Sequence, residues 1–223
     1  MIDYTDNFDN VLARIEAARL ETDEYTIVKI IAASKYVGAK EIEAMYTIGQ
    51  RSFGENRIQE LVEKSTALEA LPIEWNFIGR IQSNKINHLL DANPFLIHSC
   101  ESLEMAQEID KRAKVKGLTP NILLQINSAN EESKAGVSVE ESEDVYHDIQ
   151  AKCQNLKLKG IMSIGAHTSD EKVIAKSFEK SYKIFESLKK DGAKYCSMGM
   201  SNDFELAIKC GSNMVRLGSV LFK

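Results

Sequence analysis

The stretch Tyr195-Cys-Ser-Met-Gly-Met-Ser-Asn-Asp-Phe-Glu-Leu-Ala-Ile-Lys-Cys-Gly-Ser-Asn-Met-Val-Arg-Leu-Gly-Ser219 holds one complete strand–helix–strand unit. Residues 195–198 and 214–217 are short, mostly apolar runs of the kind that form buried strands. A predicted helix over 203–210 connects them, and small residues follow each strand. Two neighbouring strands joined by a helix run parallel with a right-handed crossover. The unit therefore predicts a parallel α/β sheet.

The same unit repeats along the whole chain. Strands are predicted over 27–34, 51–53, 75–78, 95–98, 122–127, 158–164, 195–198 and 214–217. Helices are predicted between them over 39–48, 57–71, 83–91, 102–116, 139–153, 171–190 and 203–210, and a further helix begins at Asp6 or Asn7. Strict alternation indicates parallel strands, and eight strands close a (β/α)8, or TIM, barrel. We expect an α/β fold of that class.

One helix position of this barrel needs a separate explanation. The eighth strand has no predicted helix after it, whereas the N-terminal helix has no strand before it. We therefore expect the N-terminal helix to fill the eighth helix position, with residues 1–223 forming a single domain. A doubly wound open sheet is the main alternative, but its nucleotide fingerprint GxGxxG is absent from the sequence.

The composition is typical of a cytoplasmic globular protein. The net charge of −5 and the pI near 5.5 argue against nucleic acid as a partner. The acidic N-terminus lacks a secretion signal, and the most apolar run, Ile27–Ala33, is too short to span a membrane. Four widely spaced cysteines fit no zinc or disulfide pattern. We expect reduced thiols, a cytoplasmic location, no membrane partner and no metal site.

Small, donor-rich residues follow the last two strands. The seventh strand runs into Met200 and Ser201, and the eighth runs into Gly218 and Ser219. Ser201 also precedes a predicted helix, whose N-terminus favours an anion. At a single strand end such residues usually form a plain turn, but barrels commonly bind phosphate after strands seven and eight. The pair predicts a phosphate site.

Lys35 follows the first strand on the same face as Ile31 and Ala33. If that face is the interior, the amine points to the barrel mouth, where confinement near other cations makes a lysine a usable nucleophile for Schiff-base formation. A surface lysine at the start of a loop is the plain alternative. Lys29, at the other end of the strand, is expected to be inert. An amine beside a phosphate site predicts a phosphorylated aldehyde as cofactor.

Two further residues can complete such a site. Arg216 lies near the end of the eighth strand, where it forms either an internal salt bridge or a contact to the ring nitrogen of pyridoxal phosphate. Because arginine keeps its proton, it would leave that nitrogen unprotonated, which makes the ring a weaker electron sink. Asn56, after the second strand, either donates to the ring oxygen of the cofactor or caps a helix.

The remaining polar segments are less specific. The loop 128–136 after the fifth strand is either a lid over the mouth or a plain solvated loop. The four histidines, His88, His98, His147 and His167, show no metal-ligand spacing. Glu55 and Glu60 do not form an acid–base pair that can be placed in the pocket.

An ordered series of motifs resembles the pyridoxal phosphate homeostasis protein family, the YggS/PROSC-like group related to the N-terminal barrel of alanine racemase. The resemblance spans nearly the whole chain, and each motif alone is weak. The matching segments are 33–35 (ASK), 53–60 (FGENRIQE), 75–79 (WNFIG), 82–85 (QSNK), 124–127 (LQIN), Ser133 and Lys134 with Gly136, 160–162 (GIM), 197–201 (SMGMS) with Asp203, and 215–216 (VR) with Gly218.

The resemblance implies that Lys35 carries pyridoxal 5'-phosphate (PLP) as an internal aldimine. It implies that Ser201, Gly218 and Ser219 hold the phosphate, that Arg216 meets the ring nitrogen, and that Asn56 meets the other edge of the ring. Two features depart from the family. Tyr36-Val37-Gly38 replaces the proline that often follows the lysine, and the chain ends Phe222-Lys223 where Phe-Gly is common. Neither change removes a group that the site needs.

The function that the resemblance implies is that of a PLP carrier or regulator in vitamin B6 and amino-acid balance. PLP-dependent apoenzymes are then expected acceptors, and the protein is expected to be a monomer or weak dimer. Related racemases use a second domain to supply an acid/base group, and we expect no such domain after the eighth strand. The alternatives are a minimal PLP-dependent racemase that uses Lys35, and an aldolase-like barrel that binds no cofactor.

Overall fold

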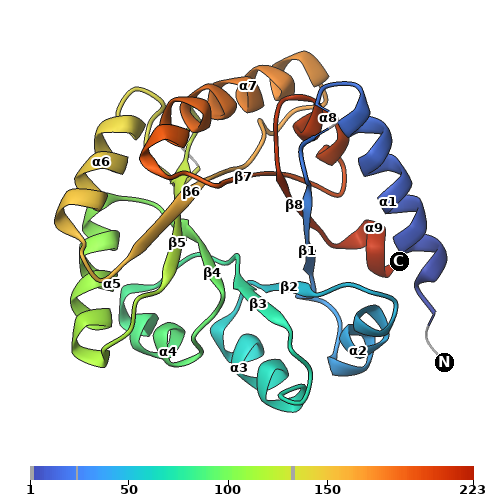
Figure 1. The fold of residues 1–223 in the computed structure, drawn as a ribbon, viewed down its shortest axis with the longest axis horizontal. Coiled ribbons are helices and arrows are strands. Elements are labelled where there is room, and N and C mark those ends of the chain that lie inside the picture. The colour runs from blue at the N-terminus through green and yellow to red at the C-terminus, as the bar shows by residue number, and fades with distance from the viewer. Residues whose placement is uncertain (1–2, 24, 132–133) are drawn as a thin grey trace.

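The computed structural model describes residues 3–23, 25–131 and 134–223 (Figure 1). Within these residues, parallel strands close into a barrel in which each strand pairs with the next along the chain and β8 pairs with β1. The strands are β1 (Lys29–Ala33), β2 (Ser52–Glu55), β3 (Glu74–Phe77), β4 (Leu96–Cys100), β5 (Asn121–Ile126), β6 (Lys157–Ser163), β7 (Tyr195–Met200) and β8 (Met214–Leu217).

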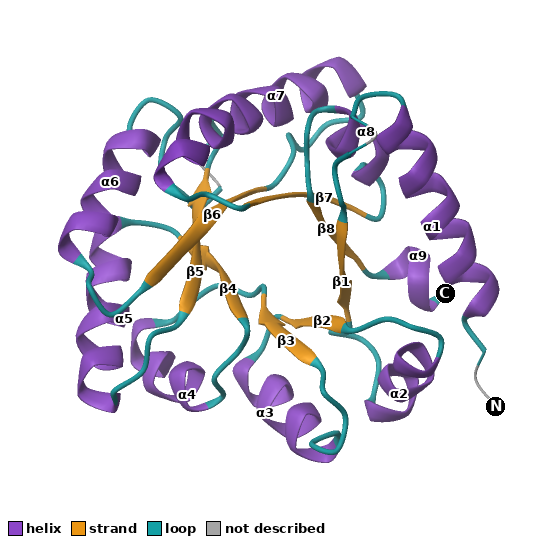
Figure 2. Cartoon of the chain, viewed as in Figure 1, coloured by secondary structure: helices purple, strands orange, loops and turns teal. Residues whose placement is uncertain are grey.

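Helices surround the barrel on its outer side (Figure 2). They are α1 (Thr5–Leu20), α2 (Ala39–Thr47), α3 (Ile58–Ala67), α4 (Ile86–Asp91), α5 (Leu103–Lys116), α6 (Ser142–Lys152), α7 (Glu171–Leu188), α8 (Phe204–Lys209) and α9 (Ser219–Phe222), with short 3-10 turns at Ser83–Lys85 and Lys189–Asp191. The predicted (β/α)8 class is confirmed. Among the described residues, no helix combines the length and apolar character that a membrane crossing requires.

Helix α1 occupies the eighth helix position, as predicted. Its buried residues Phe8, Val11 and Ile15 pack in one cluster with Phe204 of α8 and Leu221 of α9. The bidentate pair between Arg14 and Glu205, with 2.8 Å between Nε and Oε1, also fastens α1 to α8. The expectation that no helix follows β8 was wrong, because the one-turn helix α9 does. Four residues are too few to produce a helical pattern in the sequence.

The barrel interior is filled by side chains that alternate along the strands. Ile31, Leu96, Leu123, Met162 and Met214 form one buried cluster there. Ile31 and Met214 fix the inward parity of β1 and β8, so Lys29 and Arg216 also lie on the inner face. The interior is therefore mainly apolar at mid-height, with charged groups toward its two ends.

Three strands carry one extra residue relative to a neighbour. The register shifts lie in β4 between Ile97 and Cys100, in β6 around Gly160, and in β7 around Gly199. Gly199 has φ +96°, and a Cβ there would lie 2.6 Å from the Ala207 Cβ of α8. Such bulges bend a strand and re-aim the residues that follow. The β7 bulge therefore sets where Met200 and Ser201 reach the mouth.

Gly160 is expected to be the least replaceable of these positions. Its φ is +140°, and a Cβ would lie 2.0 Å from the Tyr195 carbonyl oxygen. Gly160→Ala should lower the free energy of unfolding by about 3 kcal/mol, since strain and overlap with backbone combine. Gly117→Ala is the matched control, because Gly117 has φ +66° but a Cβ there would meet no described atom within 4 Å beyond its local backbone, and the substitution should cost about 1 kcal/mol. If urea unfolding showed the same loss of free energy of unfolding for both variants, the close contact between residue 160 and the Tyr195 carbonyl would not be the cause.

Candidate functional site

The predicted site residues lie along one arc of the barrel mouth. Because β7, β8, β1 and β2 are consecutive neighbours in the closed sheet, the residues that follow these strands meet at one side of the barrel. Ser201 follows β7, Gly218 and Ser219 follow β8, Lys35 follows β1, and Asn56 follows β2. The arc therefore brings together an amine, hydroxyls, backbone N–H groups and an amide.

Lys35 lies two residues beyond β1 and is half-buried. Its Nζ lies 5.0 Å from the ring centroid of Tyr36, which is itself exposed. Lys29, at the opposite end of the strand, is ion-paired with Glu74 and lies 4.4 Å from the ring centroid of Phe95. Lys29 is thus held by a carboxylate at the far end of the barrel.

A buried ionic cluster supports the turn that carries Lys35. The Lys64 Nζ donates to the Ser34 carbonyl at 2.9 Å and to the Glu55 Oε1 at 2.8 Å, and it lies 3.3 Å from the Glu60 Oε2. The Ser34 hydroxyl donates to the same Glu55 oxygen at 2.6 Å. Glu55 is fully buried, and burial raises the pKa of its carboxyl although the bonds from Lys64 and Ser34 oppose this. Glu55 and Glu60 serve this cluster on the outer side of β2.

The hydroxyl of Ser201 joins the ends of β7 and β8. Its Oγ accepts from the Gly218 N–H at 3.1 Å and from the Val220 N–H at 3.5 Å. Ser201 lies just before α8, as expected, and the anion contact predicted for its hydroxyl at that helix terminus stays a prediction. There the Asp203 Oδ1 accepts from the Met200 N–H at 2.6 Å, so a carboxylate already occupies that turn. The anion donors that converge are those at the end of β8.

The other two residues of the predicted phosphate site lie at the rim. Met200 has 39% of its surface exposed, and its N–H is used by Asp203. Ser219 is exposed at the first position of α9. A Cβ on Gly218 would lie 3.4 Å from the Ala33 carbonyl oxygen, in the space between β8 and β1. The absence of a side chain at Gly218 keeps this side of the mouth open.

Arg216 is buried inside the barrel, with 7% of its surface exposed. Its Nη1 donates to the Ser197 carbonyl and hydroxyl, each at 2.7 Å, and its Nη2 donates to the Ser163 carbonyl at 2.9 Å. Its partners within the described residues are thus oxygens of serines, and the alternative of an internal salt bridge was wrong. Burial lowers the pKa of Arg216 to about 10, which still leaves the guanidinium protonated at neutral pH.

Three interior polar residues received no site role from the sequence. His98 lies between Ser197 and Asn76, with its Nδ1 3.2 Å from the Ser197 Oγ and its Nε2 3.3 Å from the Asn76 Oδ1. All three are buried. The available signal was a polar residue at an inward position of an otherwise apolar strand.

Asn56 is exposed, and α3 is preceded by Arg57 without a side-chain cap, so the capping alternative for Asn56 was wrong. Asn56 instead lines a cavity of about 600 Å³ beside the mouth, together with Arg57, Arg80 and Lys85. This cavity adjoins the arc on its β2 side and carries mainly positive charge.

The described part of the loop 128–136 is tied to the barrel. The Asn127 Nδ2 donates to the carbonyls of Glu131 and Lys134, and the Lys134 Nζ donates to the Gly165 carbonyl at 2.7 Å. The motif residue Ser133 and its neighbour Glu132 lie outside the described residues. These bonds fasten the loop to the ends of β5 and β6.

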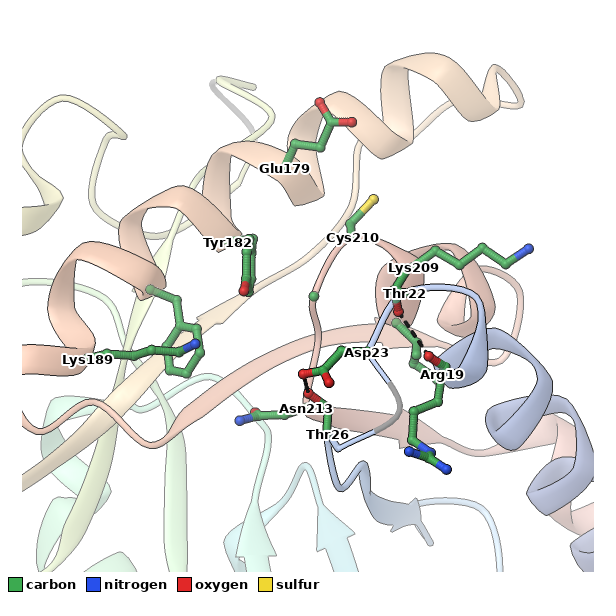
Figure 3. Close-up of a pocket in the computed structure, with 13 residues that line it drawn as sticks. Arg19, Thr22, Asp23, Thr26, Glu179, Tyr182, Lys189, Lys209, Cys210 and Asn213 are labelled. Atoms are coloured by element: carbon green, nitrogen blue, oxygen red, sulfur yellow. Dashed lines mark hydrogen bonds between the residues drawn. The ribbon is translucent and has the colours of Figure 1, made fainter.

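A second cavity, of about 370 Å³, lies at the opposite end of the barrel near the start of β8 (Figure 3). Three of its charged groups have bonds to residues nearby. Lys209 pairs with Glu21 at 2.7 Å, Lys189 pairs with Glu186 at 2.9 Å, and Asp23 accepts from the Thr26 hydroxyl at 2.5 Å. None of the predicted site residues lines it.

Comparisons with known proteins show which proteins this chain resembles. Residues 6–223 match the family model of the alanine racemase N-terminal domain. The chain is 50% identical over 223 residues to the pyridoxal phosphate homeostasis protein of Helicobacter pylori (strain ATCC 700392 / 26695), with 100% of both chains covered. It is 33% identical to the human protein of the same name, with 87% of this chain and 75% of the human one covered.

Two solved structures place the fold. PipY of Synechococcus elongatus PCC7942, solved with PLP bound, matches with a TM-score of 0.83 and 26% identity over 99% of this chain and 100% of PipY. Alanine racemase of Clostridium difficile 630 matches with a TM-score of 0.74 and 19% identity. That match covers 97% of this chain but 59% of the racemase chain, and it shows the shared barrel fold.

Proposed function

The chain belongs to the pyridoxal phosphate homeostasis protein family, and from that premise we propose that it binds PLP at the barrel mouth and carries or regulates this cofactor. PipY, a relative with the same fold, has been solved with PLP bound. The observation that supports the proposal most is the arc formed by the ends of β7, β8, β1 and β2. It holds the amine and the anion donors that the aldehyde and phosphate of PLP require, and the Arg216 guanidinium lies inside the barrel on one of its strands, β8.

The residues of the arc fit the chemistry of PLP. The two N–H groups that converge on the Ser201 Oγ, from Gly218 and Val220, can serve phosphate oxygens equally well, since both are acceptors. The space that a Cβ on Gly218 would fill lies beside Ala33, next to the turn of Lys35. Arg216 presents a cation that does not give up its proton at neutral pH.

Each residue then has one task. Lys35 would hold the cofactor covalently as a Schiff base, and Ser201, Gly218 and Ser219 would bind the phosphate. Arg216 would face the ring nitrogen. Asn56 would contact the other ring edge, and Met200 would cover the rim. When bound, PLP supplies an electrophilic aldehyde attached to an electron-withdrawing ring.

The protonated Arg216 favours binding of PLP over catalysis with it. A ring nitrogen that faces a guanidinium stays unprotonated and withdraws electrons weakly. A racemase also needs an acid/base group on each face of the cofactor. If the PLP-loaded protein exchanged the α-hydrogen of an amino acid into deuterated water at a useful rate, the carrier function would be replaced by a catalytic one.

A titration with PLP tests the proposal directly. The purified protein, freed of ligand, should gain a visible absorption band at a stoichiometry of one PLP per chain and keep it through gel filtration. A protein that stays colourless at every PLP concentration would rule out the proposed function and leave the cofactor-free aldolase alternative.

Ser201→Ala should weaken PLP binding roughly tenfold or more, because a hydrogen bond to a charged phosphate is worth about 1.5 kcal/mol or more. Ser187→Ala is the matched control, since its hydroxyl lies on the outside of α7 and bonds Glu143. Equilibrium dialysis measures both dissociation constants. Inorganic phosphate should compete less well in the Ser201 variant than in the wild type, and equal competition would contradict the phosphate role of Ser201.

We further propose that residues 1–223 act as one cofactor-binding domain and that PLP-dependent apoenzymes accept the cofactor from it. The cytosol is its proposed location, which the four free cysteines support. A monomer or weak dimer remains the expected state in solution.

A further inference from the structure

The barrel interior contains a polar column that a hydrophobic core does not need. Asn76, His98 and Ser197 are each fully buried, with 0% of their surface exposed, among inward-facing apolar side chains such as Leu96 and Met162. Buried polar groups cost free energy unless each finds a partner. Here each finds one, which makes the column a built feature of the barrel.

The direction of each hydrogen bond in the column follows from its neighbours. The Asn76 Nδ2 donates to the carbonyls of Phe53 at 3.1 Å and Glu74 at 3.0 Å, so the Asn76 Oδ1 faces His98 as an acceptor. The His98 Nε2 must therefore carry the hydrogen of that 3.3 Å contact. Burial, followed by the nearby charges of Arg216 and Lys29, lowers the pKa of His98 well below its usual range.

A neutral imidazole with its hydrogen on Nε2 leaves Nδ1 as an acceptor. The Ser197 hydroxyl, 3.2 Å away, therefore donates to His98. This turns the lone pairs of the Ser197 Oγ toward the Arg216 Nη1, which donates to it at 2.7 Å. The column thus has one polarity, from Arg216 through Ser197 and His98 to Asn76.

This polarity has a consequence for the guanidinium. Without the His98 acceptor, the Ser197 hydroxyl would have to turn its hydrogen toward another acceptor. The lone pairs of the Ser197 Oγ would then no longer be held facing Arg216. A second cation at His98 would also repel Arg216 inside a low-dielectric interior. Neutral His98 avoids both problems, and Arg216 keeps two bonds to Ser197 and one to the Ser163 carbonyl.

We propose that His98 is a positioning residue that, through the hydroxyl of Ser197, fixes the guanidinium of Arg216 at the barrel mouth. The part that concerns the cofactor rests on the proposed function, because it makes His98 responsible for how Arg216 meets the ring nitrogen of PLP. His98 itself does not touch the cofactor and carries no proton to it.

The first experiment needs no cofactor. In a 15N-labelled wild-type protein, the His98 nitrogen resonances should show a neutral ring with hydrogen on Nε2, and the Arg216 guanidinium N–H signals should be sharp. His98→Leu and Ser197→Ala should broaden or shift the Arg216 signals. Ser142→Ala is the matched control, because Ser142, the first residue of α6, is equally buried and its hydroxyl bonds the Val139 carbonyl just before that helix. Unchanged Arg216 signals in both variants would overturn the positioning role.

The second experiment uses PLP as the probe. His98→Leu should weaken PLP binding about fivefold to tenfold and move the visible band or its pH midpoint, whereas His98→Gln should restore both, since an amide can donate to Asn76 and accept from Ser197. If His98→Leu does not fold, Ser197→Ala and His98→Gln still give this comparison. If every variant showed the visible PLP spectrum of the wild type, the positioning role of His98 would be refuted, while the proposed function would stand. A wild type that takes up no PLP would refute the proposed function, while the nitrogen resonances would still decide the anchoring of Arg216.

Discussion

Replacing Lys35 with alanine is expected to abolish the covalent attachment of PLP. The variant should show no Schiff-base absorption band, and its affinity for PLP should fall on the order of a hundredfold or more, equivalent to about 3 kcal/mol. The reason is positional, because Lys35 is the lysine that follows β1 on the arc beside Gly218 and Asn56. The phosphate donors near Ser201 remain, so weak binding should persist and should be displaced by inorganic phosphate. Absorbance and equilibrium dialysis measure the two effects.

Lys40→Ala is the matched control for this experiment. Lys40 is exposed on the first turn of α2, only five residues from Lys35 along the chain. The Lys40→Ala variant should therefore bind PLP as the wild type does. Lys29 is not a substitute amine, because Glu74 holds it at the other end of β1. A visible band that survives in the Lys35 variant would assign the attachment to another amine and contradict the account of the site.

Lys64→Met is expected to produce the largest loss of stability. It removes the cation that pairs with Glu55, whose carboxylate is fully buried and whose Oε2 has no hydrogen-bond partner among the residues that the structure describes. Removing one partner of a buried pair typically costs about 3–5 kcal/mol. The variant also frees the Ser34 carbonyl and so loosens the turn of Lys35. Urea unfolding at pH 7 measures the loss, and Lys152→Met, which breaks the exposed pair with Asp148, should cost about 0.5 kcal/mol or less.

The pH dependence of this loss has a definite sign. Burial raises the pKa of Glu55 in the folded protein, and loss of Lys64 raises it further. The folded variant therefore binds a proton at a pH where the unfolded chain does not, so its stability increases as the pH falls through the raised folded pKa toward the ordinary glutamate pKa of 4.5. The difference in free energy of unfolding between the wild type and Lys64→Met should become smaller as the pH falls from 7 to 5. Adding Glu55→Gln to the Lys64→Met variant should recover much of the lost stability at pH 7. A difference that is independent of pH would exclude a buried charge as its cause.

The barrel could be predicted from the sequence because its signals are local. Each strand is a short apolar run, each long helix has its own pattern, and their alternation fixes the parallel order. The positions of Lys35, Gly218 and Ser219 follow from the same reasoning, since they come directly after strands whose carboxyl ends share one edge. The eighth helix position could be assigned to α1 by counting alone.

The parts that were missed depend on relations between distant residues. The bond from the Gly218 N–H to the Ser201 hydroxyl joins the ends of two strands, β7 and β8, and the β7 bulge at Gly199 that precedes it leaves no sequence pattern. His98 and Ser197 are 99 residues apart and meet only through the stagger of a closed barrel. Glu55 and Lys64 pair only because α3 packs against β2, and no residue spacing in the sequence reveals that packing.

Borohydride reduction of the PLP-loaded wild-type protein, followed by peptide mass mapping, tests the central claim most directly. Reduction converts a Schiff base into a stable pyridoxyl adduct on the lysine that formed it. The account predicts one adduct per chain on the peptide that contains Lys35, with Lys29 and Lys40 unmodified. An adduct on any other lysine, or none in a protein that has bound PLP, would contradict it.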